Sequence, residues 1–340
     1  MLDLDRLERI HLSSEPLGQK IMGTLVLMPN YDLPPRVEID LLGFDHVPDE
    51  PVIYAMNHTD RYNYWPFQYK LWRQQDRYTT TWVKGKYYEN EWVGKFMELT
   101  NNLPTVSRGY LIARDFLAVC DRPPTGEEYR ALRTAVDVAA GLREPSEGQT
   151  APEQAVPTAV LAKPRDVLGL RFEPDYETGT DDYTSYINSL FRMMMRRFVD
   201  LNVEAFDKGL DLLVFPQGTR SVRLSRGRIG LAQIALYLKK TVVPIGCNGS
   251  DKVYPGNSPI GRPGHITYRV GEPLTYEDMS EFHIDQDFQP FTAEAELAHR
   301  DTFQGYVDVV MERINGLLDP EYRFAEDARS DGVAGSRRFL

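Results

Sequence analysis

The chain has 340 residues, 42% hydrophobic and 26% charged, so it can bury a substantial core as one large domain or two modest ones. Its formal net charge of -11 argues against a nucleic-acid partner, because phosphate backbones are bound mainly by Lys and Arg. Cys120 and Cys247, its two cysteines, lack the spacing of a disulfide framework or a zinc site, and we expect no metal.

The amino-terminal part of the chain predicts neither export nor a membrane span. Asp3 and Asp5 lie where a signal peptide needs basic residues before an apolar run. The best apolar run, Ile21 to Met28, is far shorter than the roughly 18 residues that a spanning helix requires. We expect this run to form a buried strand or to lie on a surface. The prediction is therefore a cytoplasmic protein whose contact with a membrane is peripheral.

The first half of the chain predicts strands that alternate with helices. Short apolar or β-branched runs indicate the strands, and aromatic residues at helical spacing indicate the helices. In chain order we expect a strand over 51–56, a helix over 62–75, a strand over 78–84, a helix over 89–99, a short strand over 104–107 and a helix over 127–142. The segment 144–157, rich in Pro, Glu, Gln, Thr and Ala, is the best candidate for a linker.

The second half continues this alternation. A long helix follows Asp181 and Asp182, with an apolar stripe from Tyr183 to Ala205. After it we expect a strand over 210–215, a turn over 216–220, a helix over 229–238, strands over 242–246 and 265–270, and a final helix with apolar positions over 303–317. This order predicts an α/β fold: a mostly parallel central sheet flanked by helices, with functional residues on the loops at strand ends.

His58 is the first candidate for a catalytic residue. It follows the strand over 51–56 and precedes a helix, which places it at a sheet edge beside the positive end of the helix dipole. Asp60 and Asn63 are close in sequence, and either could accept a hydrogen bond from one imidazole nitrogen and leave the other free to take a proton. A structural histidine with satisfied hydrogen bonds would show the same pattern.

The second candidate is the turn Pro216-Gln217-Gly218-Thr219-Arg220, where a buried strand stops, turns on a glycine and presents an arginine. Backbone N–H groups and a guanidinium at such a turn suit a phosphate or a developing oxyanion. From this turn to Arg228 the acidic chain has four arginines and no acid. A plain strand-to-helix turn and a solvated basic face are the alternatives.

Further cations follow predicted strands. Arg108 comes after the strand over 104–107 and could bind a phosphate through two parallel hydrogen bonds. Lys86, after the strand over 78–84, could add a point charge. Either could equally be an ordinary surface cation. The run Met193-Met194-Met195-Arg196-Arg197 offers flexible contacts for an acyl chain beside cations for its head group, although such a Met cluster is more often core.

In their order, these residues resemble the four motifs of the lysophosphatidic acid and glycerol-3-phosphate acyltransferase superfamily, the PlsC-like acyltransferases. Asn57-His58 followed by Asn63 is similar to the first motif, Asn-His-x4-Asp, and Thr105 to Arg108 is similar to the second, which ends in an acceptor-binding arginine. The third, Phe-Pro-Glu-Gly-Thr-Arg-Ser, resembles 215–221, and the fourth, a hydrophobic strand that ends in proline, resembles 243–245. The resemblance covers about 50–250, and its third motif is the most specific.

The resemblance implies an acyltransferase that moves a fatty acyl group from acyl-CoA or acyl carrier protein to the hydroxyl of a glycerol-phosphate or lysophospholipid acceptor. His58 would be the general base, without a covalent enzyme intermediate. Arg108 and Arg220 would hold the acceptor phosphate, and we place Gln217, Gly218, Thr219 and Lys86 in the same substrate site. The resemblance implies no cofactor besides the acyl thioester co-substrate, and it implies a lipid or glycerol-phosphate acceptor and a membrane surface as partners.

The same resemblance suggests a division of the chain. We expect an N-terminal segment over 1–45, an acyltransferase-like domain over 46–325 with an insertion at about 110–192, and a C-terminal tail over 326–340. The insertion makes this part of the chain longer than its counterpart in most of the family, and a lid or an acceptor-recognition element could lie there.

Two positions depart from the family pattern. Asn63 stands where the family has Asp, and Gln217 stands where the third motif has Glu. A carboxylate stabilises the imidazolium that forms during proton transfer, and the equivalent change to an amide in a serine protease costs about 10⁴ in rate. Either Asp60 or the carbonyl oxygen of Asn63 could orient His58 instead. The competing hypotheses are a non-catalytic acyl-CoA or lipid-binding homologue with a degenerate site, and an O-acyltransferase for a non-phosphorylated acceptor.

Overall fold

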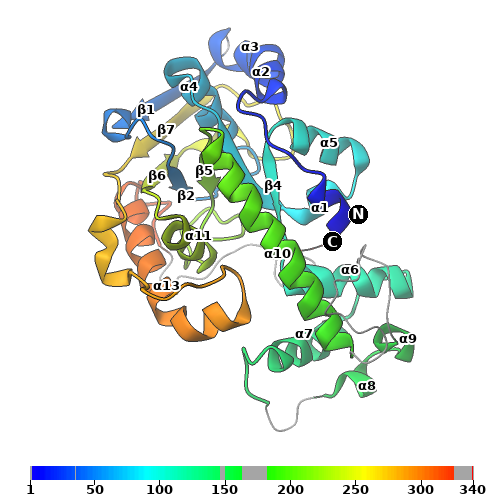
Figure 1. Cartoon of the computed structure of the whole chain (residues 1–340). Coiled ribbons are helices and arrows are strands. Elements are labelled where there is room, and N and C mark those ends of the chain that lie inside the picture. The colour runs from blue at the N-terminus through cyan, green and yellow to red at the C-terminus, as the bar shows by residue number, and fades with distance from the viewer. Residues whose placement is uncertain (1, 35, 146–149, 163–181, 325–338, 340) are drawn as a thin grey trace.

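The computed structural model describes residues 2–34, 36–145, 150–162, 182–324 and 339, and within them a seven-stranded sheet forms the centre of the molecule (Figure 1). The strands are β1 (Val37–Leu42), β2 (Ile53–Met56), β3 (Thr79–Lys84), β4 (Asn102–Thr105), β5 (Asp211–Val214), β6 (Val242–Asn248) and β7 (Gly264–Val270). They lie in the order β1-β7-β6-β2-β5-β3-β4, and the neighbours are parallel except for β6 and β7. The predicted α/β fold with a mostly parallel sheet is confirmed.

Both faces of the sheet are buried, which explains why its central strands are continuous apolar runs. In β2, Ile53 and Ala55 belong to the core on one face, and Tyr54 and Met56 to the core on the other. Alternate side chains of a strand point to opposite faces, so a strand that is covered twice needs apolar residues at every position.

The helices divide between these two cores. Apolar side chains on the first face come from α1 (Leu4–Glu8), α6 (Arg108–Cys120), α7 (Gly126–Ala139), α10 (Tyr183–Asp207), α11 (Gly230–Leu238) and α13 (Ala293–Gly316). On the second face they come from the π-helix η1 (Gly23–Leu27), α3 (Met28–Asp32), α4 (Trp65–Gln75) and α12 (Ser250–Val253). Short segments also contribute to the first core: α9 (Thr158–Leu161) and the 3-10 helices η3 (Gly85–Tyr88) and η4 (Glu277–Phe282). The remaining segments are α2 (Leu17–Met22), α5 (Glu91–Leu99), α8 (Pro152–Ala155) and the 3-10 helix η2 (Phe44–His46).

The described residues of the expected insertion are mostly helical. In Figure 1, α6, α7, α8 and α9 gather around the amino-terminal part of α10. The linker predicted over 144–157 contains α8, and its residues 146–149 lie outside the described residues, as do 163–181. Of the predicted C-terminal tail, Phe339 is described, and its ring lies 6.4 Å from that of Tyr129. The residues before 45 contribute α1 to the first core and β1 to the sheet.

The prediction of a strand for the apolar run Ile21 to Met28 is wrong. The run lies in α2, η1 and α3, which follow one another without a break. Leu27 is buried whereas Ile21 and Leu25 are exposed, because the helical period turns the run's apolar side chains to different sides. The other predicted alternative, a segment that lies on the surface, agrees with the exposed side chains of Ile21 and Leu25. Among the described helices, none combines the length and hydropathy needed to cross a membrane.

The boundaries around Arg108 also differ from the prediction. The strand expected over 104–107 is β4, which ends at Thr105, and Arg108 is the first residue of α6. Ser107 caps this helix, since its hydroxyl accepts a hydrogen bond from the N–H of Tyr110. The predicted strand over 104–107 is therefore too long at its end, because Ser107 already caps α6.

Candidate active site

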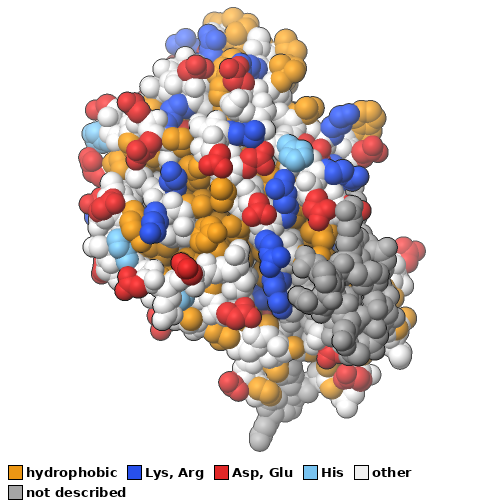
Figure 2. All heavy atoms as spheres, in the orientation of Figure 1, with side chains coloured by type: hydrophobic (Ala, Val, Ile, Leu, Met, Phe, Trp, Pro, Cys, Tyr) orange, Lys and Arg blue, Asp and Glu red, His pale blue; other side chains and the backbone are white. Residues whose placement is uncertain are grey.

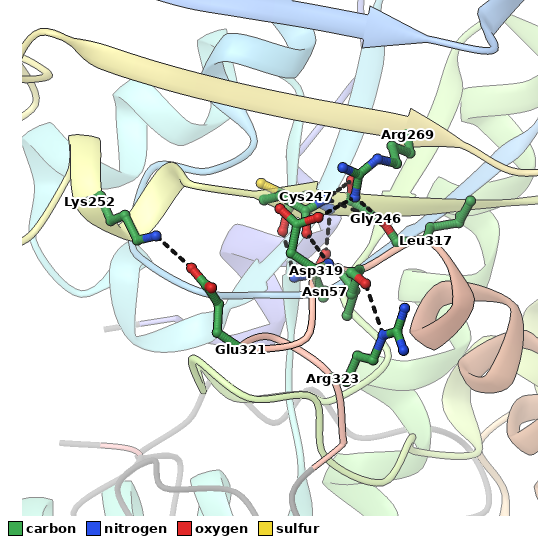
Figure 3. Close-up of polar contacts among 11 residues, drawn as sticks. Asn57, Gly246, Cys247, Lys252, Arg269, Leu317, Asp319, Glu321 and Arg323 are labelled. Carbon is green, nitrogen blue, oxygen red and sulfur yellow. Dashed lines mark hydrogen bonds and ion pairs between the residues drawn. The ribbon is translucent and has the colours of Figure 1, made fainter.

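The loop that carries His58 is fixed at the end of β2 by its neighbour Asn57. The side-chain amide of Asn57 donates to the carbonyl of Cys247 in β6 and accepts from the N–H of Cys247, at 3.0 and 2.7 Å. Figure 3 shows this pair beside the chain segment from Leu317 to Arg323. Arg269 of β7 bonds to the Leu317 carbonyl at 2.9 Å, which anchors that segment to the sheet. The backbone before His58 therefore starts from a rigid position.

Asn63 orients the imidazole of His58. Its side-chain oxygen lies 3.0 Å from Nδ1 of His58, and its Nδ2 donates to the carbonyl of Asn57 at 2.8 Å. Since a carbonyl can only accept, this second bond fixes the amide with its oxygen toward the imidazole. Nδ1 of His58 then carries the hydrogen, and Nε2, which hydrogen-bonds to no described residue, keeps its lone pair.

Gln217 joins the two motif loops and does not face the cavity. Its Oε1 accepts the backbone N–H of His58 at 2.9 Å, and its Nε2 donates to Ser225 at 3.2 Å. The backbone N–H of Ser221 donates in turn to the carbonyl of His58 at 2.8 Å. Gln217 is 1% exposed, so the structure gives it a structural role. An amide suits this place because it must both accept and donate.

The environment keeps His58 neutral. Its ring stacks on Phe215 with centroids 4.1 Å apart. Burial lowers the pKa of His58 to about 3; the hydrogen bond to Asn63 opposes this shift, and the nearby charges of Arg220 and Lys84 add to it. A neutral imidazole with a free Nε2 at pH 7 can accept a proton.

His58 lies in the wall of an apolar cavity of about 430 Å³. The cavity, here called the inner chamber, is rich in aromatic and aliphatic side chains: Tyr62, Tyr64, Trp65, Trp82, Val83, Tyr87, Val93, Phe96, Met97 and Phe215. A pocket of this composition binds an extended apolar group and leaves orientation to its few polar atoms.

A second, cationic cavity of about 520 Å³ adjoins it and is here called the outer chamber. Arg61, Lys84, Lys86 and Arg220 line it, and Arg61, Lys84 and Arg220 also border the inner chamber. The acids in its wall are Asp60 and Asp251. Four cations against two acids make the outer chamber a place for an anion.

The structure brings some of the predicted residues together and sets others apart. Lys86 and Arg220 meet in the outer chamber, where Thr219 is also part of the wall. Gly218 borders the inner chamber at the turn, with a φ of +67° that favours glycine. Asp60 makes no hydrogen bond to His58: its carboxylate accepts from the Thr59 hydroxyl and the backbone N–H of Tyr62. Of the two alternatives for orienting His58, the geometry therefore matches Asn63.

Arg108 does not reach either chamber. It lines a separate cavity with residues of α7, α10 and α13, and its guanidinium lies over the ring of Phe191. The phosphate ligand expected from the second motif is thus absent from the neighbourhood of His58. In its place stand two cations that the sequence analysis missed, Arg61 and Lys84. Their positions in the sequence could have indicated them, since Lys84 is the last residue of β3 and Arg61 lies three residues after His58.

Arg223, Arg226 and the Met cluster contact other parts of the protein and lie outside both chambers. Arg223 bonds to the carbonyls of Arg323 and Phe324, and Arg226 lies 3.8 Å from Asp308. Of the Met cluster in α10, Met194 and Met195 are buried in the first core, as expected of its core alternative. Within the described residues, no group of three or more His, Cys, Asp or Glu side chains could hold a metal ion.

Comparison with known proteins gives a likeness in shape alone. No protein-family model matches the chain, and no curated protein sequence matches it. Among solved structures, it is similar to the 1-acyl-sn-glycerophosphate (LPA) acyltransferase PlsC from Thermotoga maritima, at 13% sequence identity and a TM-score of 0.38. The match covers 92% of this chain and 78% of that chain. A likeness at this level carries no functional conclusion.

Proposed function

We propose that the protein is an acyltransferase that moves a fatty acyl group from acyl-CoA or acyl carrier protein to a hydroxyl of a glycerol-phosphate or lysophospholipid acceptor. The observation that carries the proposal is the position of His58. Its Nδ1 is held at 3.0 Å by Asn63, and its ring borders an apolar chamber that adjoins a cationic one. A general base that lies between an apolar site for an acyl chain and a cationic site for a phosphate suits acyl transfer to a phosphorylated alcohol.

In the proposed reaction, Nε2 of His58 takes the proton of the acceptor hydroxyl as its oxygen bonds to the thioester carbonyl carbon. The carbon–sulfur bond then breaks, and the thiolate leaves with the proton from the imidazolium. Asn63 stabilises the imidazolium by accepting from Nδ1–H. In this proposal the charges of Arg220 and Lys84, which border the inner chamber, also stabilise negative charge on the carbonyl oxygen.

In this proposal each chamber holds one substrate. The acyl chain lies in the inner chamber, among aromatic side chains. The acceptor phosphate lies in the outer chamber, among Arg61, Lys84, Lys86 and Arg220. Burial is the main cause of the low pKa of His58, and the charges of Arg220 and Lys84 lower it further. A bound phosphate would offset these two charges and so make the base stronger once the acceptor is in place.

A membrane surface is the proposed source of lipid substrate, with peripheral association on its cytoplasmic side. Leu17, Ile21 and Leu25 are exposed at helical spacing along α2 and η1, and Leu25 is 71% exposed. Trp92 is 82% exposed on α5, which contacts α2. Val93 of α5 borders the inner chamber, so this apolar ridge leads to the site. With a net charge of -11, apolar insertion supports docking better than attraction to anionic lipid.

The test is thiol release from a panel of long-chain acyl-CoAs, with lysophosphatidic acid or glycerol-3-phosphate present or absent. Wild type should release thiol only with acceptor, and His58→Ala should abolish the release. His265→Ala, at an exposed histidine paired with Asp40 on the far part of the sheet, is the matched control and should keep it. Equal release by wild type and His58→Ala would contradict the proposal.

A second candidate function is acyl-CoA or lipid binding without turnover. Asn63 favours it, because the amide beside Nδ1 of His58 cannot supply the carboxylate that strengthens a catalytic histidine. A binder would retain acyl-CoA affinity in His58→Ala and release no thiol with any acceptor. A third, acyl transfer to a non-phosphorylated acceptor, is favoured by the distance of Arg108 from both chambers. In that case Arg220→Gln would leave the KM for the acceptor unchanged.

A further inference from the structure

The strand order separates the positive from the negative side chains of the outer chamber. Lys84 and Lys86 lie at the end of β3, and Arg220 follows β5. Asp60 follows β2, and Asp251 follows β6. These four strands are parallel and lie in the order β6-β2-β5-β3, which puts the acids on one pair of strands and these cations on the other. At about 4.8 Å per strand, β6 and β3 are on the order of 14 Å apart, so the chamber has an acidic side and a cationic side.

The pKa shifts agree with this separation. Burial lowers the pKa of Lys86, and the charge of Arg220 lowers it further, against that of Glu89. Burial raises the pKa of Asp60, and the charge of Asp251 adds to this shift while the hydrogen bonds of Asp60 oppose it. On the face of the molecule that Figure 2 shows, by contrast, acidic and basic side chains are interspersed over much of the surface. The outer chamber therefore does not merely repeat the charge pattern of that surface.

Asp60 is a buried carboxylate that pairs with no cation among the described residues. It is 8% exposed, and its hydrogen bonds come from the Thr59 hydroxyl at 2.9 Å and the N–H of Tyr62 at 2.8 Å. Nε of Arg61, the next residue, is buried without a hydrogen-bond partner in the described part of the chain. A carboxylate oxygen can accept more than one hydrogen bond, and a buried unpaired charge is costly. A cation in the chamber would therefore stabilise Asp60.

Asp251 has the same need on the same side of the chamber. The Tyr322 hydroxyl donates to its carboxylate at 2.7 Å and so fixes the side chain. Lys252, its neighbour in sequence, pairs with Glu321 instead, as Figure 3 shows. Two carboxylates in one wall, neither of them in an ion pair within the described residues, suit an ammonium group that donates to both.

The rest of the acidic side is held in place before any ligand binds. The segment 254–257 completes this wall. The Tyr62 hydroxyl donates to the carbonyl of Asn257 at 2.7 Å, and the hydroxyls of Tyr31 and Tyr254 share a hydrogen bond of 2.6 Å. A site that is already ordered loses little affinity to the ordering of its own groups.

We propose that the acceptor is a lysophospholipid whose phosphodiester head group carries an amine, and that Asp60 and Asp251 select it. The phosphate lies on the cationic side of the outer chamber and the ammonium on the acidic side, so both charges of the zwitterion are paired. Glycerol-3-phosphate and lysophosphatidic acid present only the anion and leave the two carboxylates without a cation. The inference rests on the proposed function for acyl transfer to this acceptor, whereas the preference for the head group is a property of binding.

The test measures the binding of two water-soluble head groups by isothermal titration calorimetry. Glycerophosphoethanolamine and glycerophosphoglycerol share the phosphodiester, and only the first carries an amine. Wild type should bind the first about 10- to 100-fold more tightly, the gain expected for hydrogen bonds between charged groups. Asp60→Asn and Asp251→Asn remove the charge at constant shape, and each should reduce this ratio at least several-fold.

Asp278→Asn is the matched control. The carboxylate of Asp278 also accepts from a hydroxyl and a backbone N–H, both of Thr275, but it lines neither chamber. Its ratio should equal that of wild type. A general loss of stability would not change the ratio between two ligands of the same site, so the ratio reports selection of the amine.

The proposal is overturned if wild type binds the two head groups equally or binds neither at millimolar concentrations. An unchanged ratio in folded Asp60→Asn and Asp251→Asn would also overturn it, and if Asp60→Asn does not fold, Asp251→Asn decides. Thiol release with lysophosphatidylethanolamine or lysophosphatidylglycerol separates this inference from the proposed function. A preference for the amine in binding, without release from either lipid, supports the head-group site and contradicts the acyltransferase. Release that depends on His58, at equal kcat/KM for both lipids, supports the acyltransferase and contradicts the selection of the amine.

Discussion

Replacing Asn63 with leucine removes the group that orients His58 at nearly constant volume. The substitution leaves Nδ1–H of His58 and the carbonyl of Asn57 without their partners at 3.0 and 2.8 Å. Each of the two unpaired buried groups costs about 1–3 kcal/mol, so the free energy of unfolding should fall by about 2–6 kcal/mol. Without an acceptor at Nδ1 the tautomer is no longer fixed, and we expect kcat to fall by about 100-fold or more, toward the roughly 10⁴ of a histidine held in the wrong tautomer.

The assay is acceptor-dependent thiol release together with urea unfolding of the same samples. Asn248→Leu is the matched control: Asn248 is 3% exposed and also makes several buried hydrogen bonds, but it lines neither chamber. It should lose comparable stability and keep its kcat. Asn63→Asp retains an acceptor for Nδ1 and should keep most of its activity despite losing the bond to Asn57. A folded Asn63→Leu with wild-type kcat would refute the orienting role.

Four further outcomes follow from the structure. Gln217→Met orphans the N–H of His58 and should lower the free energy of unfolding by about 1–3 kcal/mol in a urea melt; no change would exclude the link between the motif loops. Burial lowers the pKa of His58 to about 3, so the neutral imidazole contributes its full stability above pH 6.5 and loses it as the pH falls from 6.5 toward 3. For the same reason, the acid limb of the kcat/KM profile should lie well below pH 6.5. Arg220→Gln should move that limb to higher pH, since it removes a positive charge, and raise the KM for a phosphorylated acceptor; an unmoved limb would contradict the assigned cause. Leu25→Glu should reduce co-sedimentation with phosphatidylcholine vesicles at least several-fold, compared with Leu297→Glu at an exposed leucine on α13, and equal losses would argue against the ridge.

The central strands and the loop of His58 could be predicted because their signal is local. A parallel strand covered on both faces must be apolar at every position, and the runs in β2 and β5 satisfy this. The motif residues follow such runs directly, so their place at the carboxyl edge of the sheet follows from the strand direction. The pairing of β2 with β5 then brings His58 next to the turn at Gly218.

The side of the molecule on which Arg108 lies could not be derived in the same way. The prediction extended β4 to the residue before Arg108, whereas the strand ends at Thr105 and the cap at Ser107 begins α6. The capping serine was visible in the sequence, but the direction of α6 depends on its packing against α7 and α10. The outer chamber, likewise, gathers cations from three separate loops, and only the strand order β2-β5-β3 makes Lys84 a neighbour of Arg220.

The measurement that tests the central claim most directly is the mass of the acceptor after incubation with acyl-CoA and enzyme. With wild type we predict an acylated acceptor, formed without any acyl group remaining on the protein, and with His58→Ala we predict unmodified acceptor. An acyl group on the protein would contradict direct transfer, and product from His58→Ala at the wild-type rate would contradict His58 as the base.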